Sequence, residues 1–191
     1  MIREQLRPAF VSFILFTVIT GILYPLSVTG IAQTFFKNQA NGSLLFKNGQ
    51  PAGSSLIGQP FDDPKYLWGR LSATSPVPFN AASSSGSNFG PMNPNFLNAV
   101  QTRVQSLKNS DPANKNPLPV DLVTASASGL DPHISPAAAE YQVSRIARTR
   151  KIAEETVRSI IRQHTHGRLF GIIGEPVVTV LEVNLQLETN S

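Results

Sequence analysis

The 191-residue sequence contains no cysteine. A chain without thiols can form no disulfide framework, no cysteine-based metal site and no thiol nucleophile. The absence permits an oxidising compartment outside the cytoplasm, but it does not identify one.

Charge is also scarce, because Asp, Glu, Lys and Arg make up only 15% of the chain, against about 25% in typical soluble domains. Part of this deficit lies in one place. From Pro8 to Phe36 there is no Asp, Glu, Lys, Arg or His. The sequence therefore divides into an apolar N-terminal segment and a remainder that is long enough for one domain of ordinary size.

Signatures of catalysis are missing as well. The chain has no Gly-x4-Gly-Lys-Ser/Thr loop, no Gly-x-Gly-x-x-Gly motif and no Asp-Lys-Thr-Gly phosphorylation sequence. His164 and His166 are two residues apart, so on a helix they would point to different sides and make a poor chelate. We therefore expect no catalytic residue, no metal site and no tightly bound cofactor.

The apolar segment from Phe10 to Ile31 predicts a membrane-spanning helix. Thirteen of its residues are Phe, Ile, Leu or Val, and a span needs about 20 residues. The segment meets that length even if Pro25 kinks or ends the regular helix. A buried core helix rarely runs so long without a charge, and a cleaved signal peptide has an apolar region of about 7–15 residues. We therefore expect an uncleaved transmembrane helix over residues 9–31.

The charges that flank this segment predict its orientation. Arg3 and Arg7 precede it, whereas the next cation, Lys37, lies beyond its end. Short cytoplasmic flanks carry the excess of Lys and Arg. Residues 1–8 are therefore expected in the cytoplasm and residues 32–191 on the far side of the bilayer.

A stripe of small and polar residues follows one side of the predicted helix, and it could pack against another helix in the lipid. The alternative is that its threonines bond carbonyl groups of their own helix. The stripe consists of Thr17, Thr20, Gly21 and Tyr24.

The remainder of the chain predicts one mixed α/β (α+β) domain. Ser43–Lys47 is expected to be a strand, Asn48-Gly49 a hairpin turn, and Ser55–Gly58 the returning strand. The segment from Asp62 to Pro94 is rich in Pro, Gly, Ser and Asn, but large aromatic residues interrupt it. We therefore predict an ordered functional loop.

Three helices and two further strands are expected after this loop. Asn93 with Pro94, and Ser135 with Pro136, have the pattern of an N-cap followed by the first helical position. The third helix opens at Glu154 and is expected to stop at Gly167. Strands are predicted at 120–124 and at 177–187, the second from an alternation of apolar and polar residues.

The net charge of +4 could indicate an acidic partner, but no nucleic-acid motif accompanies it, and we expect no nucleic-acid binding. Glutamates are interspersed with the cations, which favours a solvated helical surface with i,i+4 ion pairs. A docking surface for acidic groups remains the alternative. The cations concerned are Arg145, Arg148, Arg150, Lys151, Arg158, Arg162 and Arg168.

Several stretches resemble the KdpC family, the C subunits of Kdp-type potassium-transporting ATPases. The run of twenty residues from Val120 to Ala139 is the most similar. Gly53–Gln59, Tyr66–Arg70, the Phe79–Pro94 loop and Gly174-Glu175-Pro176 follow the family in order. The resemblance covers nearly the whole chain, including the apolar segment. The chain departs from the family's usual residues at Leu71, Ser85, Ala127, Ala153 and His166, and we assign His166 no role.

The resemblance implies a bacterial plasma-membrane complex in which one subunit conducts potassium and another hydrolyses ATP. In this family the C subunit is described as a catalytic chaperone that raises the ATP affinity of the hydrolysing subunit. The resemblance makes Gln163, His164 and Arg168 the candidate nucleotide-binding residues, since Arg can bind phosphate.

The expected orientation conflicts with direct ATP contact, because an extracytoplasmic domain cannot reach cytoplasmic ATP. We therefore favour a domain that caps the outer mouth of the potassium-conducting subunit and acts on ATP affinity indirectly. The competing function is a membrane-anchored module that binds a small ligand through the Phe79–Pro91 loop.

Overall fold

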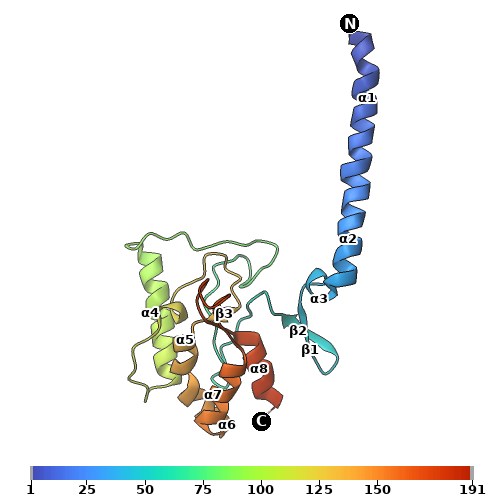
Figure 1. The fold of residues 1–191 in the computed structure, drawn as a ribbon. Coiled ribbons are helices and arrows are strands. Elements are labelled where there is room, and N and C mark those ends of the chain that lie inside the picture. The colour runs from blue at the N-terminus through green and yellow to red at the C-terminus, as the bar shows by residue number, and fades with distance from the viewer. Residues whose placement is uncertain (1, 190–191) are drawn as a thin grey trace. The chain divides into compact units, whose positions relative to one another are not determined.

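The computed structural model describes residues 2–189. The predicted segments 1–8 and 32–191 therefore each extend slightly beyond the described residues, by Met1 and by the last two residues. The chain forms two compact units, one up to Ser43 and one from Leu44 onward. As predicted, one N-terminal apolar helix is followed by a mixed domain of helices and small sheets (Figure 1).

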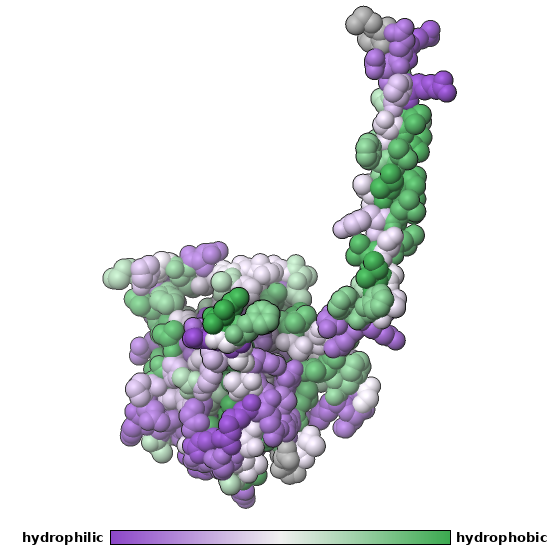
Figure 2. Space-filling view, in the orientation of Figure 1, coloured by the Kyte–Doolittle hydropathy of each residue, from purple (hydrophilic) through white to green (hydrophobic). Residues whose placement is uncertain are grey.

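The first unit consists of α1 Ile2–Val18, the π-helix η1 Ile19–Leu23, α2 Tyr24–Phe35 and the short α3 Lys37–Ala40. A continuous helical stretch of 33 residues, Arg3–Phe35, is long and apolar enough to cross a membrane, and its most apolar part has a mean hydropathy of 2.1. Hydrophobic residues cover its middle, whereas polar residues cover its first turns (Figure 2). The helix extends beyond both ends of the predicted 9–31 span.

Pro25 does not end this helix. Proline has no N–H with which to bond the carbonyl of Gly21 four residues earlier. Just before it, the backbone widens into the π-helix, and the Tyr24 N–H bonds the Ile19 carbonyl five residues back. The helix continues to Phe35, so Pro25 interrupts the regular α pattern without stopping the chain.

The second unit opens with a β-hairpin of β1 Leu44–Lys47 and β2 Gln50–Ser54. Asn48 and Gly49 have φ angles of 51° and 79°, the backbone of a two-residue hairpin turn. The first strand and the turn are confirmed, but the returning strand predicted at 55–58 is wrong. A two-residue turn requires the chain to return at once, and Pro51 concealed this strand because proline is a poor strand former.

Helix α4 Pro94–Ser110 begins as predicted, and the Asn93 side chain accepts a hydrogen bond from the Asn95 N–H at 2.9 Å. The strand predicted at 120–124 is wrong. Val120–Leu122 forms the 3-10 helix η2, with Val120 73% exposed. The Asp121 carboxylate accepts the Ser135 N–H at 2.7 Å. This tertiary bond overrides the β-propensity of the valines.

The predicted second helix is divided at Gln142 into α5 Pro136–Tyr141 and α6 Val143–Arg150. Ser135 caps it as predicted by accepting the Ala138 N–H at 3.1 Å. Helix α7 Glu154–Gln163 begins where the two glutamates predicted, but it ends with His164 as its C-cap rather than at Gly167. A small antiparallel sheet joins β3 His133–Ile134, β5 Val177–Thr179 and β4 Thr165–His166, with β5 in the middle.

The last element contradicts the long strand predicted at 177–187. Only β5 is extended, and the chain continues as helix α8 Val180–Thr189. Helix α8 buries five residues, including Leu181, and the other four have the helical spacing i, i+3, i+4 and i+7: Val180, Val183, Asn184 and Leu187. A polar residue at one of these core positions concealed the helical period.

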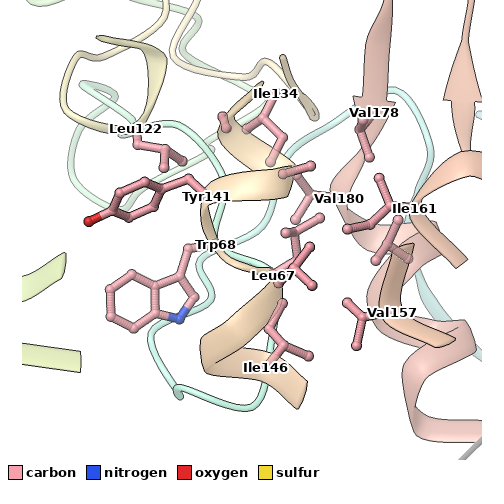
Figure 3. Close-up of a cluster of buried hydrophobic side chains, with 14 of the residues drawn as sticks. Leu67, Trp68, Leu122, Ile134, Tyr141, Ile146, Val157, Ile161, Val178 and Val180 are labelled. Carbon is pink, nitrogen blue, oxygen red and sulfur yellow. The ribbon is translucent and has the colours of Figure 1, made fainter. Parts of the chain in front are cut away.

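The core lies between helices α5 to α8 and the extended segment around Leu67. Leu67 sits at its centre in Figure 3, with Trp68 on one side and Val157 on the other. Both of the Leu67 backbone groups bond Asn184: the Leu67 N–H donates to Asn184 Oδ1 at 2.7 Å, and Asn184 Nδ2 donates to the Leu67 carbonyl at 3.0 Å. Gln142 bonds both backbone groups of Trp68 in the same way, at 2.8 and 3.1 Å. Side chains therefore take the place that a neighbouring strand would have in a sheet.

Arg145 is an exception to the predicted solvated basic surface, because it is only 2% exposed. Its guanidinium lies 4.4 Å from the centre of the Trp68 ring and donates to the carbonyls of Pro64 and Tyr66 at 2.7 and 3.1 Å. Burial lowers the pKa of Arg145 to about 10, so it stays charged at neutral pH. It holds the 64–68 segment in place together with Asn184 and Gln142. We call these three side chains the backbone clamp.

Candidate functional site

The end of α7 brings two of the three predicted nucleotide-binding residues together. Gln163 is the last residue of α7, and His164 is its C-cap. His164 Nδ1 lies 3.0 Å from a carboxylate oxygen of Glu182, and its Nε2 contacts the side-chain oxygen of Gln186. Gln186 in turn donates to the Gln163 side chain at 2.7 Å. Gln163 and His164 therefore join α7 to α8 through a polar network.

Arg168 does not share that network in the structure. Its guanidinium binds both carboxylate oxygens of Glu175, at 3.0 and 2.8 Å, across the turn that leads into β5. Both side chains are exposed, so the pair contributes little to stability. The sequence could not predict this pairing, because six residues, two of them glycines, lie between the two partners.

A shallow cleft of about 580 Å³ lies beside this region. Its lining includes Arg158, Arg162 and Glu140. Arg158 bonds Glu140 at 2.9 Å and Glu154 at 2.8 Å, and these bonds raise the pKa of Arg158. Arg162 bonds Glu155 at 2.6 Å and lowers the pKa of that carboxyl. A phosphate would have to compete with these carboxylates, so the cleft is poorly prepared for a nucleotide.

Metal binding gains no support from the geometry. Among residues 2–189, no group of three or more His, Cys, Asp or Glu is arranged to hold an ion. His166 is exposed in β4, whereas His164 turns to α8. The two side chains have different surroundings, but His166 lies in a strand, so the expectation for two histidines on one helix does not apply to them.

The predicted helix-packing stripe lies on an exposed part of the N-terminal helix. Thr17 and Thr20 each donate to a carbonyl four residues back, of Phe13 and Phe16, at 2.7 Å. This satisfies the hydroxyl groups within the helix. A Cβ at Gly21 would meet no atom within 4 Å. The stripe, which ends at Tyr24, therefore stays a prediction for the assembled protein.

The loop predicted to be ordered is fixed to the segment around residue 128. The Ser85 N–H donates to the Ser128 carbonyl at 3.0 Å, and a Cβ on Gly86 would lie 2.7 Å from the Ala127 oxygen. Gly58 packs against the loop at Phe79, so closely that a Cβ added to Gly58 would lie 2.4 Å from a ring carbon of Phe79. The loop is therefore packed tightly, although it contains almost no regular structure.

An apolar cavity of about 440 Å³ opens between this loop and α4. Its lining includes Leu71, Phe89, Phe96, Val100 and Val123. The size falls within the range of small-ligand pockets. This cavity is the feature that the alternative ligand-binding function would use.

The backbone clamp was missed by the reasoning from sequence. Asn184, Gln142 and Arg145 are polar residues that a periodicity argument assigns to the surface, yet all three are buried. The sequence did contain one signal, because Asn184 lies among apolar residues at helical spacing, between Val180 and Leu187.

Comparison with known proteins places the chain among subunits of one transporter. Residues 6–189 match the family described as KdpC, K+-transporting ATPase, c chain. A potassium-transporting ATPase KdpC subunit of Herpetosiphon aurantiacus is 59% identical, over 97% of this chain and 96% of its own. The KdpC subunit of Dechloromonas aromatica is 58% identical over 99% of both chains, and that of Ralstonia nicotianae is 57% identical over 95% of this chain and 89% of its own.

Proposed function

The chain belongs to the KdpC family, the c chains of K+-transporting ATPases, and from this premise we propose that it is a non-catalytic accessory subunit of an ATP-driven potassium uptake pump. It assembles with a potassium-conducting subunit and an ATP-hydrolysing subunit and stabilises both. The observation that carries the proposal is the extent of the family match, which includes the apolar helix as well as the folded domain.

Contact rather than chemistry is the role that the described residues support. The polar groups gathered at the end of α7 are engaged with one another, and the cations beside them are paired with carboxylates. A reaction centre needs a nucleophile, base or electrophile directed at a substrate. The chain thus acts by holding partners in place.

The folded domain lies outside the cytoplasm, with the N-terminal helix in the plasma membrane. Arg3 and Arg7 support this orientation. A single cysteine at Ala113, an exposed position in the loop after α4, tests it, because the chain has no thiol of its own. Intact cells should label Ala113→Cys with a membrane-impermeant maleimide. Gln5→Cys is the matched control and should react only after lysis. The reverse pattern would place the domain in the cytoplasm.

The subunit raises the ATP affinity of the hydrolysing partner indirectly, by favouring one conformation of the complex. The carboxylate pairing of Arg158, Arg162 and Arg168 supports this over direct phosphate binding. Arg168→Ala therefore should leave the ATP concentration for half-maximal hydrolysis unchanged in the assembled pump. Removing the whole chain should raise that concentration. A large increase with Arg168→Ala alone would instead support direct contact through Gln163, His164 and Arg168.

Assembly itself is tested by gentle solubilisation and affinity purification of the full chain. Two larger multispan proteins should co-purify with it in fixed ratio. Isolation of the chain alone, under conditions that preserve other membrane complexes, would refute the proposal.

The apolar cavity beside α4 favours a second candidate, a membrane-anchored module for a small apolar ligand. Val100→Trp would fill part of the cavity and should abolish binding of an apolar fluorescent probe to the full chain. If the cavity is a ligand site, the chain needs no pump subunits to bind the probe. Co-purification of larger subunits and binding of the probe by the chain alone therefore distinguish the two functions in the same preparation.

A further inference from the structure

The turn between β4 and β5 presents large apolar side chains to solvent. We call residues 169–173 the apolar finger. Leu169 and Ile173 are 61% and 59% exposed, Ile172 is 78% exposed, and Phe170 is 85% exposed. Single exposed apolar residues are ordinary, but a contiguous group of this kind marks an interaction site.

The apolar finger is a built element. The Leu169 N–H donates to the Ile173 carbonyl at 2.9 Å, and the Ile173 N–H donates to the Leu169 carbonyl at 3.0 Å. The ion pair of Arg168 with Glu175 closes its base. The backbone that carries the tip side chains is thus held in a defined conformation before any partner binds, which lowers the cost of ordering the turn in a complex.

Phe170 occupies the tip in a backbone conformation that suits glycine. Its φ is 53°, and that of Gly171 is 77°. A positive φ is unusual for a bulky residue, and such strain concentrates at functional sites. Phe170 is neither buried nor relaxed, so the stability of the domain does not account for an aromatic side chain there.

Charge at the base of the finger argues against a lipid surface as the occupant. Elements that insert into the membrane interface usually carry an excess of Lys and Arg for anionic headgroups. Here Nη2 of Arg168 donates to both carboxylate oxygens of Glu175, so the pair at the base offers no net charge. Apolar anchors with little charge are typical of the centre of protein interfaces, where each fills a pocket of the partner.

We propose that the apolar finger, through Phe170 and Ile172, is the anchor by which the folded domain docks into an apolar pocket on the outward face of the potassium-conducting subunit. This inference rests on the proposed function, which supplies the partner and its side of the membrane. The apolar side chains and the hydrogen-bonded turn that carries them come from the described residues themselves.

Phe170→Gly separates docking from folding. Glycine accepts the positive φ without strain, so the domain should keep or raise its melting temperature. Loss of the aromatic anchor should reduce retention of the larger subunits at least about tenfold, as expected for a hot-spot residue. Asn48→Gly is the matched control, because Asn48 also has a positive φ, 51°, in a hairpin turn between Lys47 and Gly49. It should leave retention unchanged. Full retention by Phe170→Gly would overturn the inference.

A single cysteine at Ile172 identifies the occupant. In the purified complex, Ile172→Cys should be protected from a maleimide, whereas it should react freely in the chain purified alone. Val120→Cys, at another exposed apolar residue, should react in both. Protection by lipid vesicles without other subunits, or by raised concentration of the chain alone, would assign the finger to the bilayer or to a second copy and overturn the inference.

The two proposals fail in different ways. If the wild-type chain retains no larger subunits, the proposed function fails and this inference with it. If the wild type retains them while the thiol of Ile172→Cys still reacts in the complex, only the docking site is wrong.

Discussion

Replacing Asn184 with alanine should destabilise the folded domain far more than its polar character suggests. The side chain is 2% exposed and makes two hydrogen bonds, of 2.7 and 3.0 Å, to the backbone of Leu67. Alanine would leave the Leu67 N–H and carbonyl buried without these partners. An unsatisfied buried polar group costs about 1–3 kcal/mol, so we expect a loss of about 2–5 kcal/mol in the free energy of unfolding.

Such a loss is a large fraction of the about 5–15 kcal/mol that stabilises an ordinary domain. Denaturant titration of the full chain in detergent would measure it. Trp68 is the only tryptophan, and it follows directly after Leu67, so its fluorescence reports on the clamped segment. Asn98→Ala, at an exposed position of α4, is the control and should change stability by less than about 0.5 kcal/mol.

Asn184→Leu distinguishes hydrogen bonding from packing. Leucine fills the space but supplies neither donor nor acceptor, so it should destabilise the domain about as much as alanine does. If leucine restored wild-type stability, the loss in alanine would be that of a cavity. If alanine cost less than about 1 kcal/mol, the reasoning that side chains replace a neighbouring strand would be refuted.

Three further changes test other parts of the structure. Gly58→Ala should lower the free energy of unfolding by about 1–3 kcal/mol through overpacking, since the new Cβ would lie 2.4 Å from a ring carbon. Gly90→Ala is the control and should leave stability unchanged, because its Cβ would meet no atom within 4 Å. Equal shifts in melting temperature for the two variants would contradict the overpacking at Gly58. Hydrogen bonds, first of all that from Lys47, lower the pKa of Glu188 in the folded protein. Ionised Glu188 therefore adds to the free energy of unfolding above the ordinary Glu pKa of about 4.3. This stabilisation is lost as the pH falls through the lowered pKa of the folded state. Between pH 5 and 3, Glu188→Gln should therefore lose less unfolding free energy than the wild type, and parallel titrations would exclude the effect. Gly21→Leu should leave the isolated chain stable but reduce retention of the larger subunits, because close helix approach needs a small residue; unchanged co-purification would remove Gly21 from the interface.

Local signals in the sequence predicted where several elements begin. Asn93 and Ser135 cap α4 and α5 with their own side chains, and the turn at Asn48 sets the first hairpin. These features depend on hydrogen bonds between residues that are close in sequence, so the local sequence is sufficient to predict them.

Elements that depend on distant partners could not be predicted in the same way. Residues 120–124 have the composition of a strand, but within residues 2–189 they pair with no strand, and Asp121 instead bonds the start of α5. The alternation that predicted a strand at 177–187 holds only for β5, because from Val180 onward the chain packs as a helix with Asn184 buried. In both places tertiary contacts decided between conformations that the local sequence allowed.

The nucleotide-binding role of Gln163, His164 and Arg168 stays a prediction, and the structure shows only how these residues are arranged. Gln163 and His164 do lie together, because adjacent residues at a helix end share their surroundings. Arg168 binds Glu175 instead, since the chain reverses after β4 and brings a carboxylate opposite it. The burial of Arg145 could not be predicted, because the sequence of its own helix gives no sign of the Trp68 ring against which it stacks.

The clamp on the 64–68 segment also governs alignment. Two paired strands can slide past one another by two residues and still bond, because every second residue repeats the same backbone pattern. Asn184 and Gln142 each bond the backbone of a single residue. A shift of the segment would therefore break the hydrogen bonds to both side chains at once. The backbone groups of Leu67 and Trp68 are thereby occupied, and another molecule could not use them to build a sheet. A protein with so little regular sheet thus avoids both slippage and edge-to-edge aggregation at its centre.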